Sequence, residues 1–184
     1  MKKLVRTTKE TRVEVRLERS LEPGLSEVSV DTGAPFFDHM LTALLRYAGL
    51  RCELKATGDL KHHLMEDVAI TLGRAVRRAL PAAVARYGER TIPMDDALVH
   101  AAIDIGGRFY FAGQLPNRLY THVLRSFADA LGATLHVRIL AGEDRHHLIE
   151  AAFKATGLAL RDAMSETGSG VFSTKGVAEI EDET

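Results

Sequence analysis

The chain has 184 residues, of which 46% are hydrophobic and 27% charged, and this suits one compact domain or two closely packed half-domains. Its 24 Lys and Arg residues balance its 25 Asp and Glu residues, with no basic block, so we expect no nucleic-acid partner. Cys52 is the only cysteine, and no apolar run reaches the roughly 18 residues of a membrane span. We therefore expect a cytoplasmic protein with small or individually recognised partners and no membrane contact.

The first predicted element is a β-hairpin over residues 11–31. Val13, Val15 and Leu17 alternate with charged residues, which is the period of two of a half-buried strand. The segment EPG then predicts a turn, and the alternation resumes at 28–30.

Two helices and a strand complete the first half of the chain. Pro35 is expected to open the first helix and Gly49 to end it, with an inward stripe of Phe37, Met40, Leu41, Leu44 and Leu45. The segment RCELKAT predicts a strand. A second helix is expected from His62 to Pro81, with the inward residues Val68, Ala69, Leu72, Ala75 and Val76.

The second half repeats this order. The predicted elements are strands over 97–105 and 108–113 around a Gly106-Gly107 turn, a helix over 117–132, a strand over 134–140 and a helix over 146–164. Seven residues separate Glu66 from Gly73 and Glu150 from Gly157, and ten separate His39 from Gly49 and His122 from Gly132. Internal duplication accounts for this agreement, although two similar amphipathic helices could mimic part of it by chance. The expected fold is α+β, with duplicated ββαβα half-domains at 1–90 and 91–166 and a C-terminal tail at 167–184.

Histidines concentrate in the repeat. GDLKHHLMED at 58–67 returns as GEDRHHLIEA at 142–151, and six of the eight histidines fall at duplicated positions. On a helix, residues i and i+4 share one face while i+1 points about 100° away, so we expect adjacent histidines to serve different ions. The set then divides into two sites of three His and one Glu, drawn from His39, His62, His63, Glu66, His122, His146, His147 and Glu150.

The ligand types limit the choice of metal. Imidazole and carboxylate without thiolate suit Mn, Fe, Co or Zn, and four protein ligands on an octahedral ion leave two positions for substrate or water. The alternatives are a purely structural metal, or histidine pairs that only cap their helices and face water. His100 and His136 have no duplicated partner, so we assign them to packing or surface.

The end of the chain carries a candidate anion site. Ser173, Thr174, Lys175 and Gly176 offer two hydroxyls, an ammonium and an approachable backbone, which suits phosphate. A solvated tail is the alternative interpretation of this segment.

Five motifs coincide with those of one known family. DTGAPFFDHML at 31–41, HHLMED at 62–67, IPMDDAL at 92–98, HHLIEAAFKA at 146–155 and STKG at 173–176 stand in the order of imidazoleglycerol-phosphate dehydratases, which the chain resembles over nearly its whole length. The resemblance implies a fold of the ribosomal-protein-S5 domain 2-like type, two Mn²⁺ per active site, and sites built between the chains of a homo-oligomer of twenty-four copies. It also implies that D-erythro-imidazoleglycerol phosphate loses water to give imidazole acetol phosphate in histidine biosynthesis.

The resemblance further implies roles for individual residues. The metal ligands are the same eight that the repeat selects. Phosphate binding falls to Arg86, Arg108, Ser173 and Lys175, and Lys154 and Glu10 match positions near the imidazole and the glycerol hydroxyls. The implied substrate-binding set is Glu10, His39, His62, Glu66, Arg86, Arg108, His146, Lys154, Ser173, Thr174 and Lys175. The implied catalytic set is Glu10, Glu66, Glu150 and Lys154, with Glu10 as the favoured base for the C2 proton.

The chain also departs from the family pattern. The link in GDLKHH is short, HHLMED replaces the commoner HHTVED, Tyr47 stands where many members have His, and Phe172 stands where Pro usually precedes STKG. From the residues alone, two other functions stay open. One is a dinuclear metallohydrolase, whose ions lie ~3.5–4 Å apart and share a ligand. The other is a structural metal-binding assembly protein with closed coordination.

Overall fold

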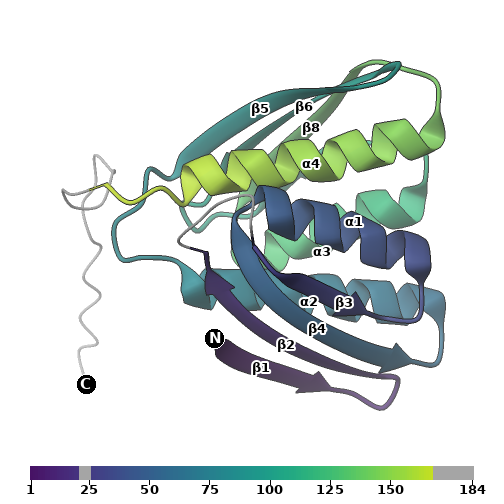
Figure 1. The fold of residues 1–184 in the computed structure, drawn as a ribbon, viewed down its shortest axis with the longest axis vertical. Helices are drawn as coiled ribbons and strands as arrows, with labels where there is room; N and C mark the ends of the chain where they lie inside the picture. The colour runs from purple at the N-terminus through teal and green to yellow at the C-terminus, as the bar shows by residue number, and fades with distance from the viewer. Residues whose placement is uncertain (21–25, 168–184) are drawn as a thin grey trace, which may run out of the picture.

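The computed structural model describes residues 1–20 and 26–167, in which two four-stranded sheets enclose four helices (Figure 1). The first half contains β1 (Lys2–Thr7), β2 (Thr11–Arg19), β3 (Val28–Asp31), α1 (Pro35–Tyr47), β4 (Leu50–Gly58) and α2 (Lys61–Ala79). The second half contains β5 (Tyr87–Met94), β6 (Ala97–Asp104), β7 (Tyr110–Ala112), α3 (Arg118–Leu131), β8 (Thr134–Ala141) and α4 (Arg145–Ala163). The predicted α+β class and the duplicated half-domains are confirmed, but each half begins with three strands, so its order is βββαβα and not ββαβα.

The pairing of the strands differs from the prediction. The strand orders are β1-β2-β4-β3 and β5-β6-β8-β7. Because β2 and β3 each pair with β4, one antiparallel and one parallel, the hairpin predicted over 11–31 is wrong. The hairpin predicted around Gly106 and Gly107 is wrong for the same reason, since β8 lies between β6 and β7. The predicted EPG turn lies outside the described residues.

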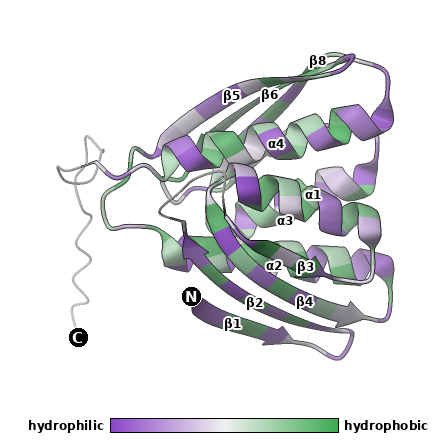
Figure 2. Cartoon of the chain, in the orientation of Figure 1, coloured by the Kyte–Doolittle hydropathy of each residue, from purple (hydrophilic) through white to green (hydrophobic). Residues whose placement is uncertain are grey.

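The hairpins that do form use two strands that were not predicted. β1 pairs with β2, and β5 pairs with β6, both antiparallel. β1 and β5 lie at sheet edges and expose most of their side chains. They therefore lack the alternation of buried and exposed residues that marks β2 and β4, which Figure 2 shows as alternating hydropathy.

The predicted helix faces are buried. All ten side chains expected to face inward on α1 and α2 are in the hydrophobic core. The left-handed backbone that glycine tolerates ends two of the helices, since Gly49 has φ 69° and Gly132 has φ 73°. None of the helices in the described part of the chain is long and apolar enough to cross a membrane.

The helices pack across the two halves, with α1 against α4 and α2 against α3 (Figure 1). Gly73 on α2 and Gly157 on α4 occupy equivalent positions of the repeat. A Cβ at Gly73 would lie 2.5 Å from the backbone oxygen of Phe127, and one at Gly157 would lie 2.4 Å from that of Leu44. The repeated glycine thus permits each close approach between the halves.

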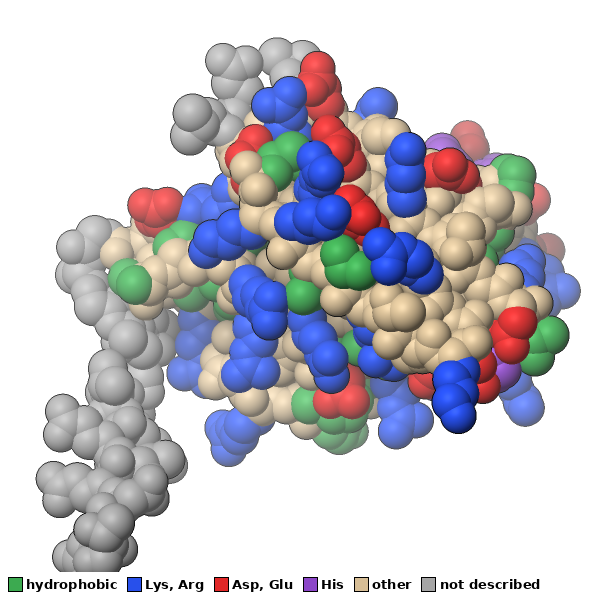
Figure 3. All heavy atoms as spheres, turned by 90° about the horizontal axis from the view of Figure 1, so that it is seen from below, with side chains coloured by type: hydrophobic (Ala, Val, Ile, Leu, Met, Phe, Trp, Pro, Cys, Tyr) green, Lys and Arg blue, Asp and Glu red, His purple; other side chains and the backbone are tan. Residues whose placement is uncertain are grey.

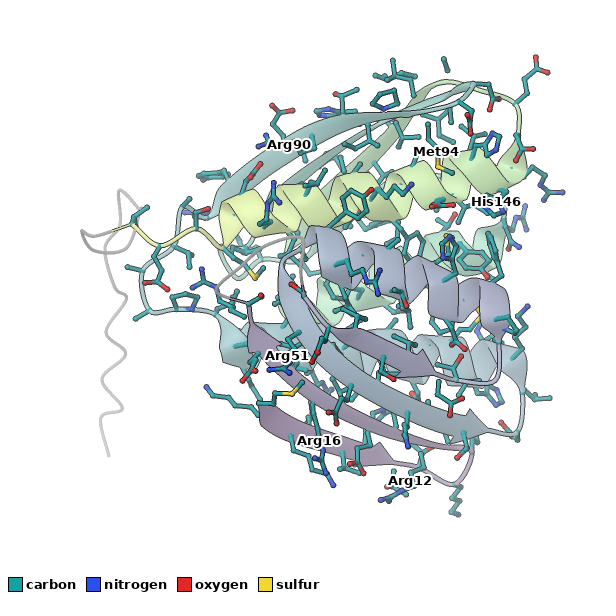
Figure 4. All side chains as sticks on the ribbon, in the orientation of Figure 1. Arg12, Arg16, Arg51, Arg90, Met94 and His146 are labelled. Carbon is teal, nitrogen blue, oxygen red and sulfur yellow. The ribbon has the colours of Figure 1, made fainter. Side chains whose placement is uncertain are left out.

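The outer face of the first sheet is charged, with both signs interleaved (Figure 3). Glu14 pairs with Lys3 at 2.8 Å and with Arg16 at 3.5 Å. Arg12 and Arg51 also point away from the helices (Figure 4). Exposed pairs of this kind add little stability, so the fold depends on the buried layer of helices rather than on this face.

The glycine contacts generate a stability prediction. Gly73→Ala and Gly157→Ala place a methyl group against a backbone carbonyl, so each should lower the free energy of unfolding by about 1–3 kcal/mol, although alanine favours helix by about 1 kcal/mol. Urea unfolding followed by circular dichroism measures this. Asp129→Ala on the exposed face of α3 is the control. Equal or greater stability in the glycine variants would mean that the helices separate without cost.

Candidate metal centres

The first cluster lies between α1 and α4, at the N-terminal end of α4, where Figure 4 labels His146. His39 comes from α1, and His146 and Glu150 stand one turn apart on α4. Glu150 Oε2 lies 3.2 Å from His39 Nε2 and 2.9 Å from His146 Nε2. The three ligand atoms lie within 4.8 Å of one another, and they come from both halves of the repeat.

Glu150 is buried, with 6% of its surface exposed, whereas the side chains of His39 and His146 are 52% and 50% exposed. The Lys154 ammonium lies 2.9 Å from Glu150 Oε1 and 3.6 Å from the sulfur of Met94 (Figure 4). Burial alone would raise the pKa of Glu150, but the Lys154 ammonium and the two imidazoles outweigh it, so the net shift is downward. Glu150 is therefore held as the anion, which a metal ligand must be.

The second cluster has the same composition and lies between α2 and α3. His62 and Glu66 stand one turn apart on α2, and His122 is on α3. Glu66 lies 3.1 Å from His122 Nε2 and 3.8 Å from His62 Nε2, and the two imidazoles stack with their centroids 5.1 Å apart. His122 Nε2 is buried, and although Glu66 lies 3.1 Å away, the two groups are not oriented for a hydrogen bond. A buried imidazole nitrogen without a hydrogen-bond partner fits a metal ligand.

The adjacent histidines do not share a cluster. His62 belongs to the second cluster and His146 to the first, while His63 and His147 lie outside both. This separation follows from helical geometry, because neighbours on a helix point about 100° apart. Within the described part of one chain, each cluster therefore holds three protein ligands instead of the four that were predicted.

The turns of the two hairpins bring carboxylates to the outlying histidines. Glu10, after β1, has Oε2 3.5 Å from His63 Nδ1, and its backbone oxygen accepts a hydrogen bond from Asp59 N at 3.0 Å. Asp59 Oδ1 lies 3.0 Å from His63 Nδ1, and Asp96 Oδ1 lies 2.7 Å from His147 Nδ1. These hydrogen bonds raise the pKa of His63 and of His147 above the ordinary histidine value. Glu10 was predicted from the sequence, whereas Asp59 and Asp96 were not. Asp59 stands beside the first histidine motif and Asp96 within IPMDDAL, and these places were their only signal.

The predicted phosphate residues lie at the other end of the second half. Arg86 N donates to the backbone oxygen of Ala163, the last residue of α4, at 2.9 Å. Arg86 is thus about 25 Å along α4 from His146, at about 1.5 Å per residue. The backbone oxygen of Arg108 accepts a hydrogen bond from Thr134 Oγ1 at 3.2 Å. Thr134 is the first residue of β8, whereas α4 follows the last residue of that strand, so Arg108 lies at the opposite end of β8 from the start of α4. One chain does not bring these arginines to its own clusters.

Arg86 is held by Asp104, which receives hydrogen bonds from Nε at 2.7 Å and from Nη2 at 3.0 Å. A Cβ at position 106 would lie 2.3 Å from Arg86 Nε, so any side chain there would displace the guanidinium from this position. A depression of about 290 Å³ adjoins Arg86 and is also lined by Arg77 and Gly107. The two guanidinium groups make one wall of it positively charged. The remaining predicted phosphate residues, Ser173, Thr174 and Lys175, lie outside the described residues, and so does Phe172.

Two departures from the family pattern border the clusters. The Tyr47 ring centroid lies 5.8 Å from Lys154 Nζ, beside the first cluster. The short link in GDLKHH leads directly into α2, where Asp59 Oδ1 accepts a hydrogen bond from Leu60 N at 2.6 Å. Both changes therefore act on the immediate surroundings of the ligands.

The chain is similar in sequence to known dehydratases. A sequence model of the family described as imidazoleglycerol-phosphate dehydratase matches residues 32–160. The imidazoleglycerol-phosphate dehydratases of Caldivirga maquilingensis and Deinococcus radiodurans are 45% and 43% identical to this chain. These alignments cover 94% of the chain and 95% and 96% of those proteins, so the similarity is not confined to one motif.

The fold is similar to solved members of the same family. The crystal structure of the Pyrococcus furiosus enzyme in complex with (S)-C348 matches with a TM-score of 0.85 at 40% identity, over 95% of this chain and 100% of that one. The Staphylococcus aureus imidazoleglycerol-phosphate dehydratase matches with a TM-score of 0.74 at 27% identity, over 91% and 100%. By sequence and by fold, the chain belongs to the imidazoleglycerol-phosphate dehydratase family of hydro-lyases.

Proposed function

We propose that the chain is a metal-dependent dehydratase that converts D-erythro-imidazoleglycerol phosphate to imidazole acetol phosphate and water. The observation that carries the proposal is the pair of clusters with two histidines and one glutamate each. Two matched clusters suit a substrate whose imidazole ring offers two nitrogens. Family membership supports the reaction class, loss of water, and the pathway, histidine biosynthesis.

The donor set fits divalent transition metals, with two Mn²⁺ per active site as the preferred choice. The clusters offer imidazole and carboxylate groups, and the only thiol, Cys52, is buried away from them. The buried His122 nitrogen, which faces Glu66 without a hydrogen bond, and the anionic Glu150 support this assignment. When bound, the ions would hold the substrate imidazole through its nitrogens and stabilise the negative charge that develops on the ring.

The complete active site is proposed to form between copies of the chain. Each cluster holds three of its four expected ligands, and His63 and His147 lie outside with 31% and 29% of their side chains exposed. Arg86 and Arg108 lie at the far end of the second half. The side chains of His39, His62 and His146 are at least half exposed, so both clusters are open to a neighbouring surface. A homo-oligomer, expected to contain twenty-four copies, lets one copy supply what another lacks.

The residues of the chain then take distinct parts in the reaction. The C3 hydroxyl of the substrate leaves, the C2 proton is removed, and the resulting enol tautomerises to the ketone. Glu10 presents a carboxylate beside His63 for the C2 proton. Glu66, Glu150 and Lys154 complete the proposed catalytic set. The phosphate would be held by Arg86, Arg108, Ser173, Thr174 and Lys175, which fixes the orientation of the substrate.

Turnover with defined metal tests the proposal. Protein loaded with Mn²⁺ should convert imidazoleglycerol phosphate to the ketone, chelation should abolish this, and added Mn²⁺ should restore it. His146→Ala removes one ligand and should lower turnover by about 10²-fold or more, the scale of one lost catalytic group.

The matched control is His136→Ala on β8, whose ring contacts Tyr110 and neither cluster. It should retain near wild-type turnover. No ketone from the metal-loaded protein would exclude the proposed reaction. Release of phosphate from simple esters would instead favour the metallohydrolase, which the separate glutamates of the two clusters do not support.

A second prediction concerns the base. Glu10→Gln should retain Mn²⁺ and substrate binding while turnover falls by about 10²-fold or more, because the amide cannot accept the C2 proton. Steady-state kinetics and metal analysis measure the two effects separately. Glu14→Gln, on the outer face of the same hairpin, should be close to wild type. Near-normal turnover in Glu10→Gln would remove Glu10 from this role.

A further inference from the structure

Asp96 holds the ring of His147 from one side. His147 Nδ1 lies 2.7 Å from Asp96 Oδ1. The other oxygen, Asp96 Oδ2, accepts hydrogen bonds from the backbone N–H groups of Glu143 at 2.7 Å and Asp144 at 3.0 Å. One carboxylate therefore connects the β5–β6 turn, the loop after β8 and the first turn of α4.

This contact decides which ring nitrogen carries the proton. An ionised carboxylate only accepts hydrogen bonds, so Nδ1 donates, and in the neutral imidazole the lone pair then lies on Nε2. The backbone under the ring is fixed as well, because Asp144 Oδ1 caps α4 by accepting from His146 N at 2.7 Å and from His147 N at 3.1 Å. His147 is thus constrained in both tautomer and position.

We propose that Asp96 is a positioning residue that presents Nε2 of His147 to a metal ion in the cluster of another copy of the chain. The inference rests on the proposed function, in which His147 is a metal ligand. Loss of a carboxylate that orients a metal-bound histidine typically costs about 10–100-fold in metal affinity or activity. Asp96 needs no ligand role of its own, because both of its oxygens are engaged within the chain.

Asp59 provides a weaker equivalent in the first half. Its Oδ1 lies 3.0 Å from His63 Nδ1 and also accepts the hydrogen bond from Leu60 N. Both side-chain contacts lie at the start of α2, and only the backbone N–H of Asp59 reaches the β1–β2 turn, where it donates to Glu10 O. Asp96 is instead anchored by a separate loop. Asp59 therefore restrains His63 less than Asp96 restrains His147.

A purely structural role for Asp96 would need only the two backbone hydrogen bonds to Oδ2, with the Oδ1 contact incidental. Asp95 also approaches His147, with Oδ2 3.4 Å from Nε2, but its side chain is 72% exposed and it reaches the nitrogen that the metal would use. Asp95 therefore does not fix the ring in the metal-binding orientation. The two roles of Asp96 are separable by substitution.

Asp96→Asn separates them, because the amide keeps the shape of the carboxylate but has one acceptor oxygen. If that oxygen keeps the backbone hydrogen bonds, the NH₂ group faces Nδ1, which must then accept, and the proton moves to Nε2. Calorimetric titration of the metal-free full-length protein with Mn²⁺ alone should show the site that depends on His147 weakened by about 10-fold or more. A cooperative thermal unfolding transition of the metal-free variant checks that the fold is kept.

Two further variants make the result decisive. His147→Ala should lose the same Mn²⁺ site, and Asp129→Asn, the same charge change on the exposed face of α3, should titrate like the wild type. Wild-type affinity in Asp96→Asn, with His147→Ala defective, overturns the positioning role and leaves the proposed function intact. Wild-type affinity in His147→Ala contradicts the proposed ligand set and the inference with it.

If Asp96→Asn does not fold, Asp59→Asn decides the question, because the contacts of that side chain lie within one helix start. It should weaken the Mn²⁺ site that depends on His63 by about 10-fold, the lower end of the range for such carboxylates. Wild-type Mn²⁺ affinity in Asp59→Asn would overturn the inference.

Discussion

The packing of helix on helix across the two halves is the constraint on which both clusters depend. Each cluster needs a histidine from the other half, since His39 on α1 meets α4 and His122 on α3 meets α2. Gly73 and Gly157 let these backbones approach. Any side chain there would push the helices apart, and metal coordination distances tolerate changes of only about 0.2 Å. The glycines and the ligands are therefore parts of one geometric requirement.

The two clusters have the same ligands but different surroundings. Glu150 is almost fully buried and paired with Lys154, whereas the side chain of Glu66 is 36% exposed. Four residues after each glutamate stand Ile70 and Lys154, so the ammonium belongs to one half only. Charge interactions strengthen as water is excluded, so the charge contacts of Glu150 are stronger than those of Glu66. The two halves therefore share the ligand frame but differ in the electrostatics around it.

The sequence predicts those features that depend on local spacing. The pairing of His62 with Glu66 follows from the i, i+4 rule, and the buried faces of α1 and α2 follow from their periodicity. His39 and His122 were predicted as ligands, but the cluster that each of them joins was not, because this depends on which helices of the two halves pack together. Strands β1 and β5 gave no signal, since an edge strand that exposes most of its side chains has no buried stripe. Asp96 was missed because its contact with His147 spans 51 residues and exists only once that hairpin has formed.

The turns of the two hairpins carry carboxylates that have different roles in the proposed reaction. Both turns bring a carboxylate to the second histidine of an HH pair, Glu10 to His63 and Asp96 to His147. Hydrogen bonds from two backbone N–H groups hold the pKa of Asp96 well below its ordinary value, and a carboxylate so stabilised as the anion is a poor proton acceptor. The Glu10 side chain is 54% exposed and lies farther from its histidine. In the proposed reaction the anchored carboxylate therefore orients a ligand, while the exposed one is able to take a proton.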